Sequence, residues 1–288
     1  MNANWDLLLL EFRKNGGIAE NICLKEGVLG RGIFPLNPSL KSKIHVPPKL
    51  LIKKEDIILE RNKLRIKKDK GYCQEVREFF NFYQDNFSWE GGKESTEFFE
   101  RGLYLLPSDI KKLIKNYTLL DLEERHSGNW NDVVKTVFLN ARGVNFEEKS
   151  VIAPIWELVN HEINSFPFLI SSNGISTPNY APRKSELTQV YGYQSSLMRV
   201  LQYGFFCKEA VVFSLPFTLI CKESSREIIC KGLELSEDKL KFKVTSSKII
   251  IDCLPIGSPI KPLLPIRYFE QISKESRLQD LSYDLFRK

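Results

Sequence analysis

Residues 154–163 read P-I-W-E-L-V-N-H-E-I and place a polar Asn-His pair directly after a short apolar run. We expect the run to form an apolar strand that the pair closes. Residues 190–205 read V-Y-G-Y-Q-S-S-L-M-R-V-L-Q-Y-G-F and set two Tyr-Gly pairs around one amphipathic helical segment. These two arrangements are either accidental or form the floor of one site, so we next consider what the rest of the chain permits.

The composition is that of a globular protein. The chain has 288 residues, of which 42% are hydrophobic and 27% are charged, which suits one large domain or a domain plus a small lobe. No apolar run approaches the roughly 20 residues that a membrane-spanning helix needs. The cluster at residues 7–10 follows an aspartate and is too short for a signal sequence. We therefore expect a cytoplasmic protein that does not bind a membrane.

The spacing of cysteine and histidine argues against a metal site. The six cysteines form no C-x-x-C or C-x-C pair, and the three histidines lie far apart in the sequence. We expect no bound metal, and small buried or half-buried thiols in a reducing compartment.

The net charge is +6, and much of the basic excess lies in residues 49–70. Lysine and arginine alternate there with isoleucine and leucine, which we interpret as the solvated face of helical turns. Nucleic-acid binding is the alternative for this segment, but the chain carries no recognised signature of a nucleic-acid-binding fold. We expect no nucleic-acid partner.

The pattern of apolar residues predicts an α+β fold. It predicts a helix at 5–14, a small sheet with tight turns at 18–51, and helical structure from 53 to about 140. Strands follow from 151, with a loop at 171–179, and a last helix begins at Pro265. The clearest helical segments are 76–87 and 109–115, and the aromatic row of the first is expected in the core: Phe79, Phe80, Phe82, Tyr83 and Phe87. The architecture is thus a mainly β unit with a helical insertion and a short C-terminal lobe.

An ordered set of short motifs resembles a known family. The set comprises N-G-G at 15–17, G-R-G-I-F at 30–34, V-P-P-K-L-L-I at 46–52, A-R at 141–142, P-I-W-E-L-V-N-H at 154–161, Y-G-Y-Q-S-S at 191–196 and Y-G-F at 203–205. Each motif alone is weak, but their order resembles the SET-domain protein methyltransferases, and within them the Rubisco large-subunit methyltransferase class. The resemblance implies a SET domain at 1–206 with a helical insertion at about 53–140. Residues 207–288 would then be a short lobe that resembles the start of a substrate-binding domain.

The resemblance implies that the chain binds S-adenosylmethionine. Gly30 and Gly32 would allow close approach of the backbone to this cofactor, and Arg31 would add donors. Asn160 would bond the methionyl end and His161 would lie near the adenine. A further matching residue, Arg142, would help to hold the cofactor. The alternatives are an ordinary turn at 30–32, a buried and bonded asparagine, and a surface ion pair for the arginine.

The same resemblance makes Tyr191 the catalytic residue and lets Tyr203 and Phe205 wall the cofactor and the substrate channel. Methyl transfer to an amine is an in-line displacement, so its catalyst must align the reacting groups and accept the amine uncharged. The alternative is that Leu197, Leu201 and Phe205, at helical steps, belong to the core.

The resemblance implies that the chain methylates a protein substrate with S-adenosylmethionine. We expect the methylated residue to be a lysine of a non-histone protein, and we expect the enzyme to be a monomer. Two alternatives remain open, which are a catalytically inactive SET-like binding module and methylation of a histidine. The chain departs from the family pattern at Ser195-Ser196, at Glu157 before the Asn-His pair, and at Ala141 before Arg142. None of these departures removes the tyrosine or the Asn-His pair.

Overall fold

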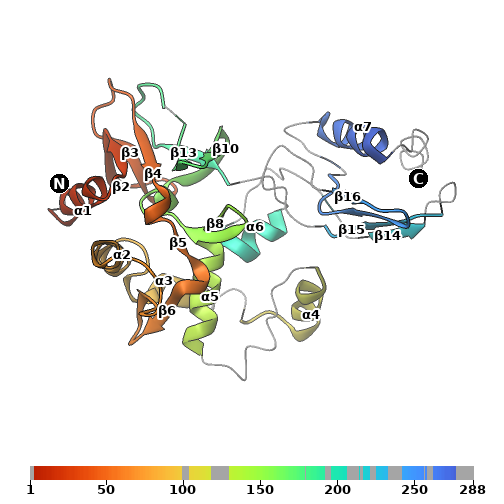
Figure 1. Cartoon of the computed structure of the whole chain (residues 1–288), viewed down its shortest axis with the longest axis horizontal. Helices are drawn as coiled ribbons and strands as arrows, with labels where there is room; N and C mark the ends of the chain where they lie inside the picture. The colour runs from red at the N-terminus through yellow and green to blue at the C-terminus, as the bar shows by residue number, and fades with distance from the viewer. Residues whose placement is uncertain are drawn as a thin grey trace. The chain divides into compact units, whose positions relative to one another are not determined.

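The computed structural model divides into two compact units (Figure 1). The first contains residues 1–105 and 124–191, and the second contains residues 106–123 and 192–288. The structure describes residues 3–98, 104–117, 130–178, 180–191, 196–205, 214, 217–220, 225–232, 242–255, 257 and 262–276. The predicted boundary at residue 206 stays a prediction.

The first unit opens with α1 (Ala3–Lys14), as predicted. Its buried residues follow the helical period and are Trp5, Leu8, Leu9 and Phe12. This face packs against α2 (Gln74–Asn86) and β1 (Ile18–Glu20). The helix ends at Lys14, and Gly16 in the following turn has a φ of 83°, a conformation that glycine adopts without steric cost.

The first unit carries several small sheets, which are mostly antiparallel, so the predicted α+β class is confirmed. One sheet has the order β1-β4-β12-β11, another has the order β5-β9-β8, and three are strand pairs, β2-β3, β6-β7 and β10-β13. The pair β10-β13 is parallel. The bounds are β2 (Ile22–Gly27), β3 (Gly30–Pro35), β4 (Lys43–Val46), β5 (Ile52–Lys53), β6 (Ile57–Glu60), β7 (Lys63–Ile66), β8 (Gly143–Phe146), β9 (Lys149–Ile152), β10 (Asn160–Pro167), β11 (Leu169–Ser171), β12 (Gly174–Ser176) and β13 (Thr188–Val190).

The basic segment at 49–70 does not form helical turns, so this prediction was wrong. Apart from two short 3-10 turns, it contains β5 and the hairpin β6-β7, whose buried residues Ile57, Leu64 and Ile66 lie on one face. The alternation of charge and apolar side chain has the period of two that a half-buried strand needs. Arg61 and Asn62 both have positive φ, 48° and 62°, which is the conformation of a tight hairpin turn.

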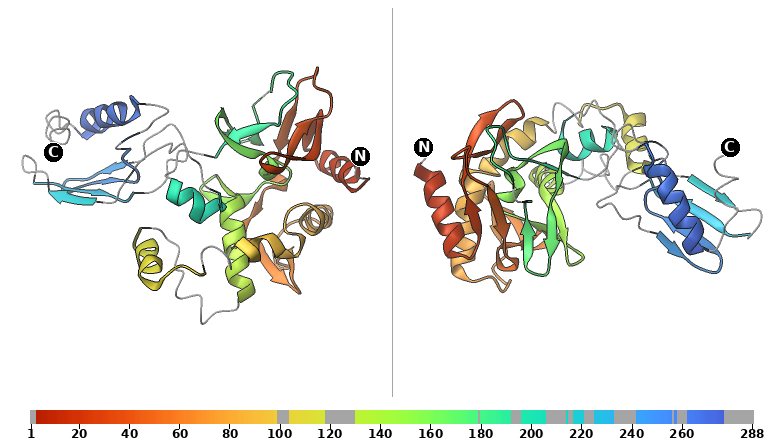
Figure 2. Two further views of the ribbon diagram at one scale, coloured as in Figure 1. Left: turned by 180° about the vertical axis from the view of Figure 1, so that it is seen from behind. Right: turned by 90° about the horizontal axis from the view of Figure 1, so that it is seen from above.

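The helical segment predicted at 76–87 forms α2, and its aromatic row lies in the core. Phe79, Phe80, Tyr83 and Phe87 are buried, and Phe82 packs against them half-buried. The helices α3 (Lys93–Phe98) and α5 (Trp130–Arg142) complete the first unit. Figure 2 shows these helices beside the small sheets from two further directions.

The apolar run of residues 154–159 is not a strand, so this prediction was wrong. It coils into a 3-10 turn at Trp156–Leu158, and Asn160 opens strand β10 instead of closing one. The run is buried on every side, so no strand periodicity is imposed on it. The loop predicted at 171–179 is likewise in part a hairpin, because β11 pairs with β12 at Ser171 and Gly174.

The second unit contains a sheet in the order β14-β15-β17-β16. Its strands are β14 (Phe217–Ile220), β15 (Glu227–Cys230), β16 (Phe242–Val244) and β17 (Lys248–Ile251), and its helices are α4 (Ser108–Tyr117), α6 (Ser196–Tyr203) and α7 (Leu264–Ser276). Helix α7 confirms the predicted last helix and lies over one face of the sheet (Figures 1 and 2).

Three of the four cysteines that the structure describes are buried as predicted, namely Cys23, Cys230 and Cys253. Cys73 is exposed, because it lies just before α2, and Cys207 and Cys221 lie outside the described residues. Within the described part of the chain, no helix combines the length and the apolar character needed to cross a bilayer.

Candidate functional site

The 3-10 turn before Asn160 sets the position of the candidate site. Ile155 has a φ of 68°, which is rare for a β-branched residue, and its side chain is fully buried. Burial in the core holds this unfavourable backbone, and the Val159 N–H donates to the Trp156 carbonyl at 3.1 Å to close the turn. The chain therefore leaves the core at Asn160 in a fixed direction.

A buried carboxylate ties this turn to α2. Glu157 Oε1 accepts hydrogen bonds from the Tyr83 hydroxyl, at 2.8 Å, and from the Ser88 hydroxyl. Burial raises the pKa of Glu157, and the nearby positive charges of Arg142 and Arg31 oppose this rise. Glu157 thus anchors α2 and Ser88 to the turn that precedes Asn160.

Asn160 connects strand β3 to the segment before β13. Its Nδ2 donates to the Arg31 carbonyl at 3.1 Å and to Glu186 Oε1 at 2.6 Å. Both of these hydrogen bonds use the amide nitrogen, Nδ2. The amide oxygen, Oδ1, is therefore the atom of this side chain that can accept a hydrogen bond. The bonded form predicted as the alternative for Asn160 is therefore present, together with an acceptor that suits a ligand.

Neighbouring side chains lie very close to the backbone at Gly32. A Cβ at Gly32 would lie 1.9 Å from Glu186 Oε1 and 2.7 Å from Asn160 Nδ2, so a side chain there would displace the two residues that form this hydrogen bond. Gly30 differs, since a Cβ there would meet no atom within 4 Å, and its φ of 88° belongs to the turn between β2 and β3. Of the two glycines, only Gly32 has tight surroundings, and the predicted approach of the cofactor to both stays a prediction.

Glu186 is the residue of this cluster that sequence reasoning missed. It is buried, and burial raises the pKa of its carboxyl, with a further rise from the neighbouring charge of Glu162; the hydrogen bond from Asn160 and the charge of Arg183 oppose the rise. Thr188 donates to Glu162 Oε2 at 2.6 Å on the adjoining strands. Two carboxylates thus lie near Asn160 and make this part of the site negative.

Arg31 does not direct its guanidinium into this cluster. It forms an ion pair with Glu90 and donates to the Phe87 carbonyl at 2.9 Å, both after α2. Arg31 therefore contacts Asn160 through its backbone carbonyl, while its side chain connects β3 to the segment after α2.

His161 and Tyr191 lie together, as the resemblance implied for residues of one site. The Tyr191 N–H donates to His161 Nδ1 at 3.1 Å, and the ring centroids are 5.3 Å apart. The Tyr191 hydroxyl donates to the Val159 carbonyl at 2.7 Å. The parallel pairing of β10 with β13 sets this contact, because it places His161 opposite Gln189.

Gln189 is a second residue that the sequence analysis missed. It is fully buried between Thr188 and Val190, and neither its amide nitrogen nor its amide oxygen has a hydrogen-bond partner among the described residues. A buried amide without hydrogen-bond partners costs free energy, and this one lies opposite His161. No sequence signal marks it, because glutamine in a short strand is unremarkable.

Three predicted site residues remain: Arg142, Tyr203 and Phe205. The Arg142 guanidinium lies 4.9 Å from the Phe138 ring centroid and near Glu157, so it is half-buried against α5 instead of forming a surface ion pair. Tyr203 and Phe205 belong to the second unit, where their rings stack with centroids 5.9 Å apart. Their assignment to the cofactor and the channel stays a prediction.

Comparison with solved structures finds similarity to SET domains. The chain is similar to the SET domain of LSMT bound to lysine and AdoHcy, with 13% identity and a TM-score of 0.44 over 77% of this chain and 62% of that chain. It is similar to Rubisco LSMT bound to AdoMet, with 13% identity and a TM-score of 0.44 over 77% of this chain and 61% of that chain. For Rubisco LSMT bound to sinefungin and monomethyllysine the identity is 13% and the TM-score is 0.42, over 77% and 61%.

The chain spans about 62% of the length of the first of these structures. No family model matches the sequence. No curated protein matches it. The identities and TM-scores are too low to transfer a function, so the functional inference rests on the chain's own residues.

Proposed function

We propose that this chain is a SET-type protein methyltransferase that uses S-adenosylmethionine and methylates a lysine side chain of a protein. The observation that carries the proposal is that Asn160 bonds to β3 beside Gly32, while the next residue, His161, bonds to Tyr191. The ordered motifs predict that these residues bind the cofactor or take part in the reaction. They come from three segments that lie far apart in the sequence.

The polar groups around Asn160 fit the cationic end of this cofactor. Asn160 Oδ1 is an acceptor, and the carboxylates of Glu186 and Glu162 add negative charge beside it. Asn160 and Glu186, which meet beside Gly32, would hold the methionyl ammonium. When bound, S-adenosylmethionine supplies a methyl group on a positively charged sulfur.

Tyr191 would position the reacting groups as a hydrogen-bond acceptor. Its hydroxyl proton is donated to the Val159 carbonyl, so the phenolic oxygen presents its lone pairs, and not its proton, to a substrate. Such an oxygen suits an uncharged amine N–H or a polarised methyl group. Because His161 accepts from the Tyr191 backbone N–H, the tyrosine is held at both ends.

The substrate in this proposal is a protein other than a histone. The chain has a net charge of +6, so its electrostatic match to a strongly basic histone tail is poor. A less basic or acidic protein would meet the enzyme with favourable long-range attraction.

Incubation of the purified chain with methyl-labelled S-adenosylmethionine and a whole-cell lysate, followed by site-resolved mass spectrometry, tests the proposal. We expect label on a lysine, and labelling about a hundredfold to a thousandfold slower with Tyr191→Phe at the same protein concentration. Label on a histidine would overturn the lysine assignment and keep the enzyme. Cofactor binding without any transfer would instead favour an inactive binding module.

A further inference from the structure

A cavity lies in the first unit, between the hairpin β6-β7, helix α5 and the turn between β8 and β9. Its volume is about 580 Å³, within the usual range for small-molecule sites. Buried Ile57 and Leu139 give it an apolar wall. None of the residues assigned to the methyltransferase site lines it.

Four lysines line this cavity: Lys54, Lys67, Lys135 and Lys149. Lys135 is paired with Asp132 at 2.9 Å, whereas Lys54 and Lys67 form no ion pair among the described residues. Their ammonium groups donate to neutral oxygens, Lys54 to Asn140 Oδ1 at 2.6 Å and Lys67 to the Glu55 carbonyl at 2.6 Å. A neutral acceptor holds an ammonium group in place without cancelling its charge.

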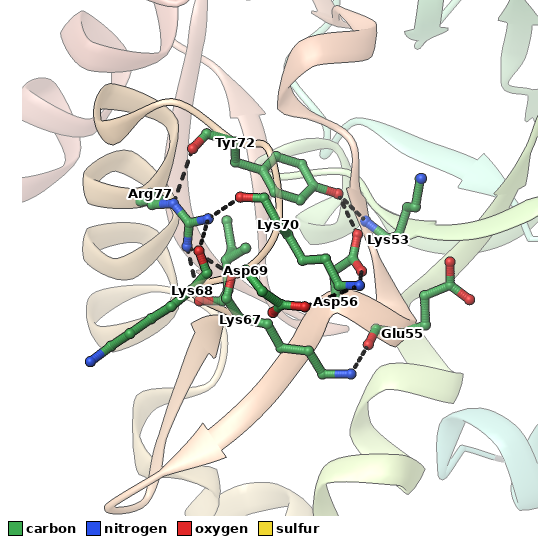
Figure 3. A network of polar contacts seen from close by, with 10 residues as sticks. Lys53, Glu55, Asp56, Lys67, Lys68, Asp69, Lys70, Tyr72 and Arg77 are labelled. Atoms are coloured by element: carbon green, nitrogen blue, oxygen red, sulfur yellow. Dashed lines mark hydrogen bonds and ion pairs between the residues drawn. The ribbon is translucent and has the colours of Figure 1, made fainter.

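The carboxylates at this cavity do not neutralise that pair. Figure 3 shows Lys67 reaching the backbone oxygen of Glu55, while the Glu55 carboxylate points away from the ammonium. Glu148 is an exposed residue in the turn between β8 and β9. Burial lowers the pKa of Lys54 and no charged group is among the causes, which agrees with an ammonium that lacks a counter-ion.

The backbone that carries Lys67 is held rigidly. Its N–H donates to the Asp56 carbonyl at 2.8 Å, and Arg77 donates to its carbonyl at 3.0 Å (Figure 3). Tyr72 in turn donates to Asp56 Oδ2 at 3.1 Å. A site with fixed backbone loses less conformational entropy when a ligand binds than a flexible surface does.

We propose that this cavity binds a small organic phosphate, with Lys54 and Lys67 holding the phosphate and the wall of Ile57 and Leu139 contacting the organic part. For two ammonium groups that have no carboxylate partner, a dianionic phosphate is a better match than a ligand with one carboxylate. Lysine is also a common phosphate ligand. The site is separate from the proposed methyltransferase site, so either assignment can fail without the other.

The first test uses the unmodified chain and sodium pyrophosphate as the probe. Limited acetylation with an amine-reactive reagent at constant ionic strength, read by mass spectrometry, gives the reaction rate of each lysine. We expect pyrophosphate to slow the acetylation of Lys54 and Lys67 several-fold and to leave their neighbours Lys53 and Lys68, which do not line the cavity, unchanged. Equal slowing of all four lysines, or none, would overturn the proposal.

The second test compares two double variants that lose the same charge. Calorimetric titration with pyrophosphate should show affinity at least about tenfold weaker for Lys54→Met with Lys67→Met, and unchanged for Lys53→Met with Lys68→Met. Equal weakening in both variants would indicate diffuse charge attraction and would overturn the site. Adenosine monophosphate should bind more tightly than a short phosphoserine peptide, and the reverse order would overturn the small-molecule assignment.

Discussion

Asn160 Nδ2 lies 2.6 Å from Glu186 Oε1, and a Cβ at Gly32 would collide with both partners of this hydrogen bond. The bond joins strand β10 to the segment before β13 and fixes which atom of the Asn160 amide faces a ligand. Removing any member of this group should therefore affect the other two.

Gly32→Ala should weaken both folding and cofactor binding. Its Cβ would collide with the Glu186 carboxylate, whose displacement breaks the bond to Asn160, at an expected cost of about 1–3 kcal/mol in unfolding free energy. Gly71→Ala is the matched control, because a Cβ there meets nothing within 4 Å. Urea unfolding followed by tryptophan fluorescence measures the effect in the first unit, which contains all four tryptophans.

A second variant separates collision from backbone strain in this experiment. If the carboxylate is the obstacle, then the double variant should be about as stable as Glu186→Ala alone, since the colliding atoms and their hydrogen bond to Asn160 are already absent from that variant. An additive loss in the double variant would contradict this account of Gly32.

Asn160→Ala should weaken the binding of S-adenosylmethionine by about 1–3 kcal/mol, because a buried polar group of the ligand would lose its partner. Calorimetric titration of the folded variant measures this loss. Asn21→Ala is a useful control, since Asn21 also bonds backbone carbonyls but lies away from the site, at Asn37 and Leu40. Unchanged affinity in folded Asn160→Ala would remove this residue from the cofactor site.

The pH dependence of stability should change in Glu157→Gln. Burial raises the folded-state pKa of Glu157 above its unfolded value of about 4.3. The favourable contribution of its protonated form is then complete below that value and is lost as the pH rises through the folded pKa. A glutamine keeps an acceptor for Tyr83 and Ser88 and does not ionise.

The stability of Glu157→Gln relative to the unaltered chain should therefore rise as the pH increases from about 4 toward 8. Urea unfolding at several pH values measures this difference, with exposed Glu26→Gln as the control. Parallel stability curves for Glu157→Gln and the unaltered chain would show that the buried carboxyl does not couple folding to pH.

The sequence was sufficient wherever apolar spacing alone decides the element. The helices α1, α2 and α7 have one apolar face each, and the aromatic row of α2 lies in the core as its spacing predicts. The sequence pattern led to a wrong prediction of helical turns at β6-β7, where basic residues alternate with isoleucine and leucine. In that segment the two-residue period and the turn at Arg61-Asn62 carried the information, and the charge did not.

The site was predictable only in part. The motifs identified Gly32, Asn160, His161 and Tyr191, which the structure joins through hydrogen bonds and close approach. Glu186 and Gln189 were missed because their importance arises from contacts with strand β10, far away in sequence, and a single glutamate or glutamine has no distinguishing pattern. Tertiary contacts of this kind require the fold to be known.

Tyr191→Phe should reduce the rate of methyl transfer about a hundredfold to a thousandfold, as expected when one preorganised polar contact is lost from a transition state. Cofactor affinity should change little, because the ring remains. The hydroxyl also donates to the Val159 carbonyl, so the variant should lose about 1 kcal/mol of stability. A change in melting temperature therefore does not distinguish catalysis from packing at this residue.

Tyr180 provides the control that does distinguish them. It is a buried tyrosine whose hydroxyl donates to a backbone carbonyl, that of Thr188 at 2.8 Å. Tyr180→Phe should therefore lose a similar stability while keeping its rate of methyl transfer. Single-turnover assays and thermal unfolding on both variants test the assignment: equal rates in the two would show that the Tyr191 hydroxyl serves the fold alone, and a loss confined to Tyr191→Phe supports its role in positioning the reacting groups.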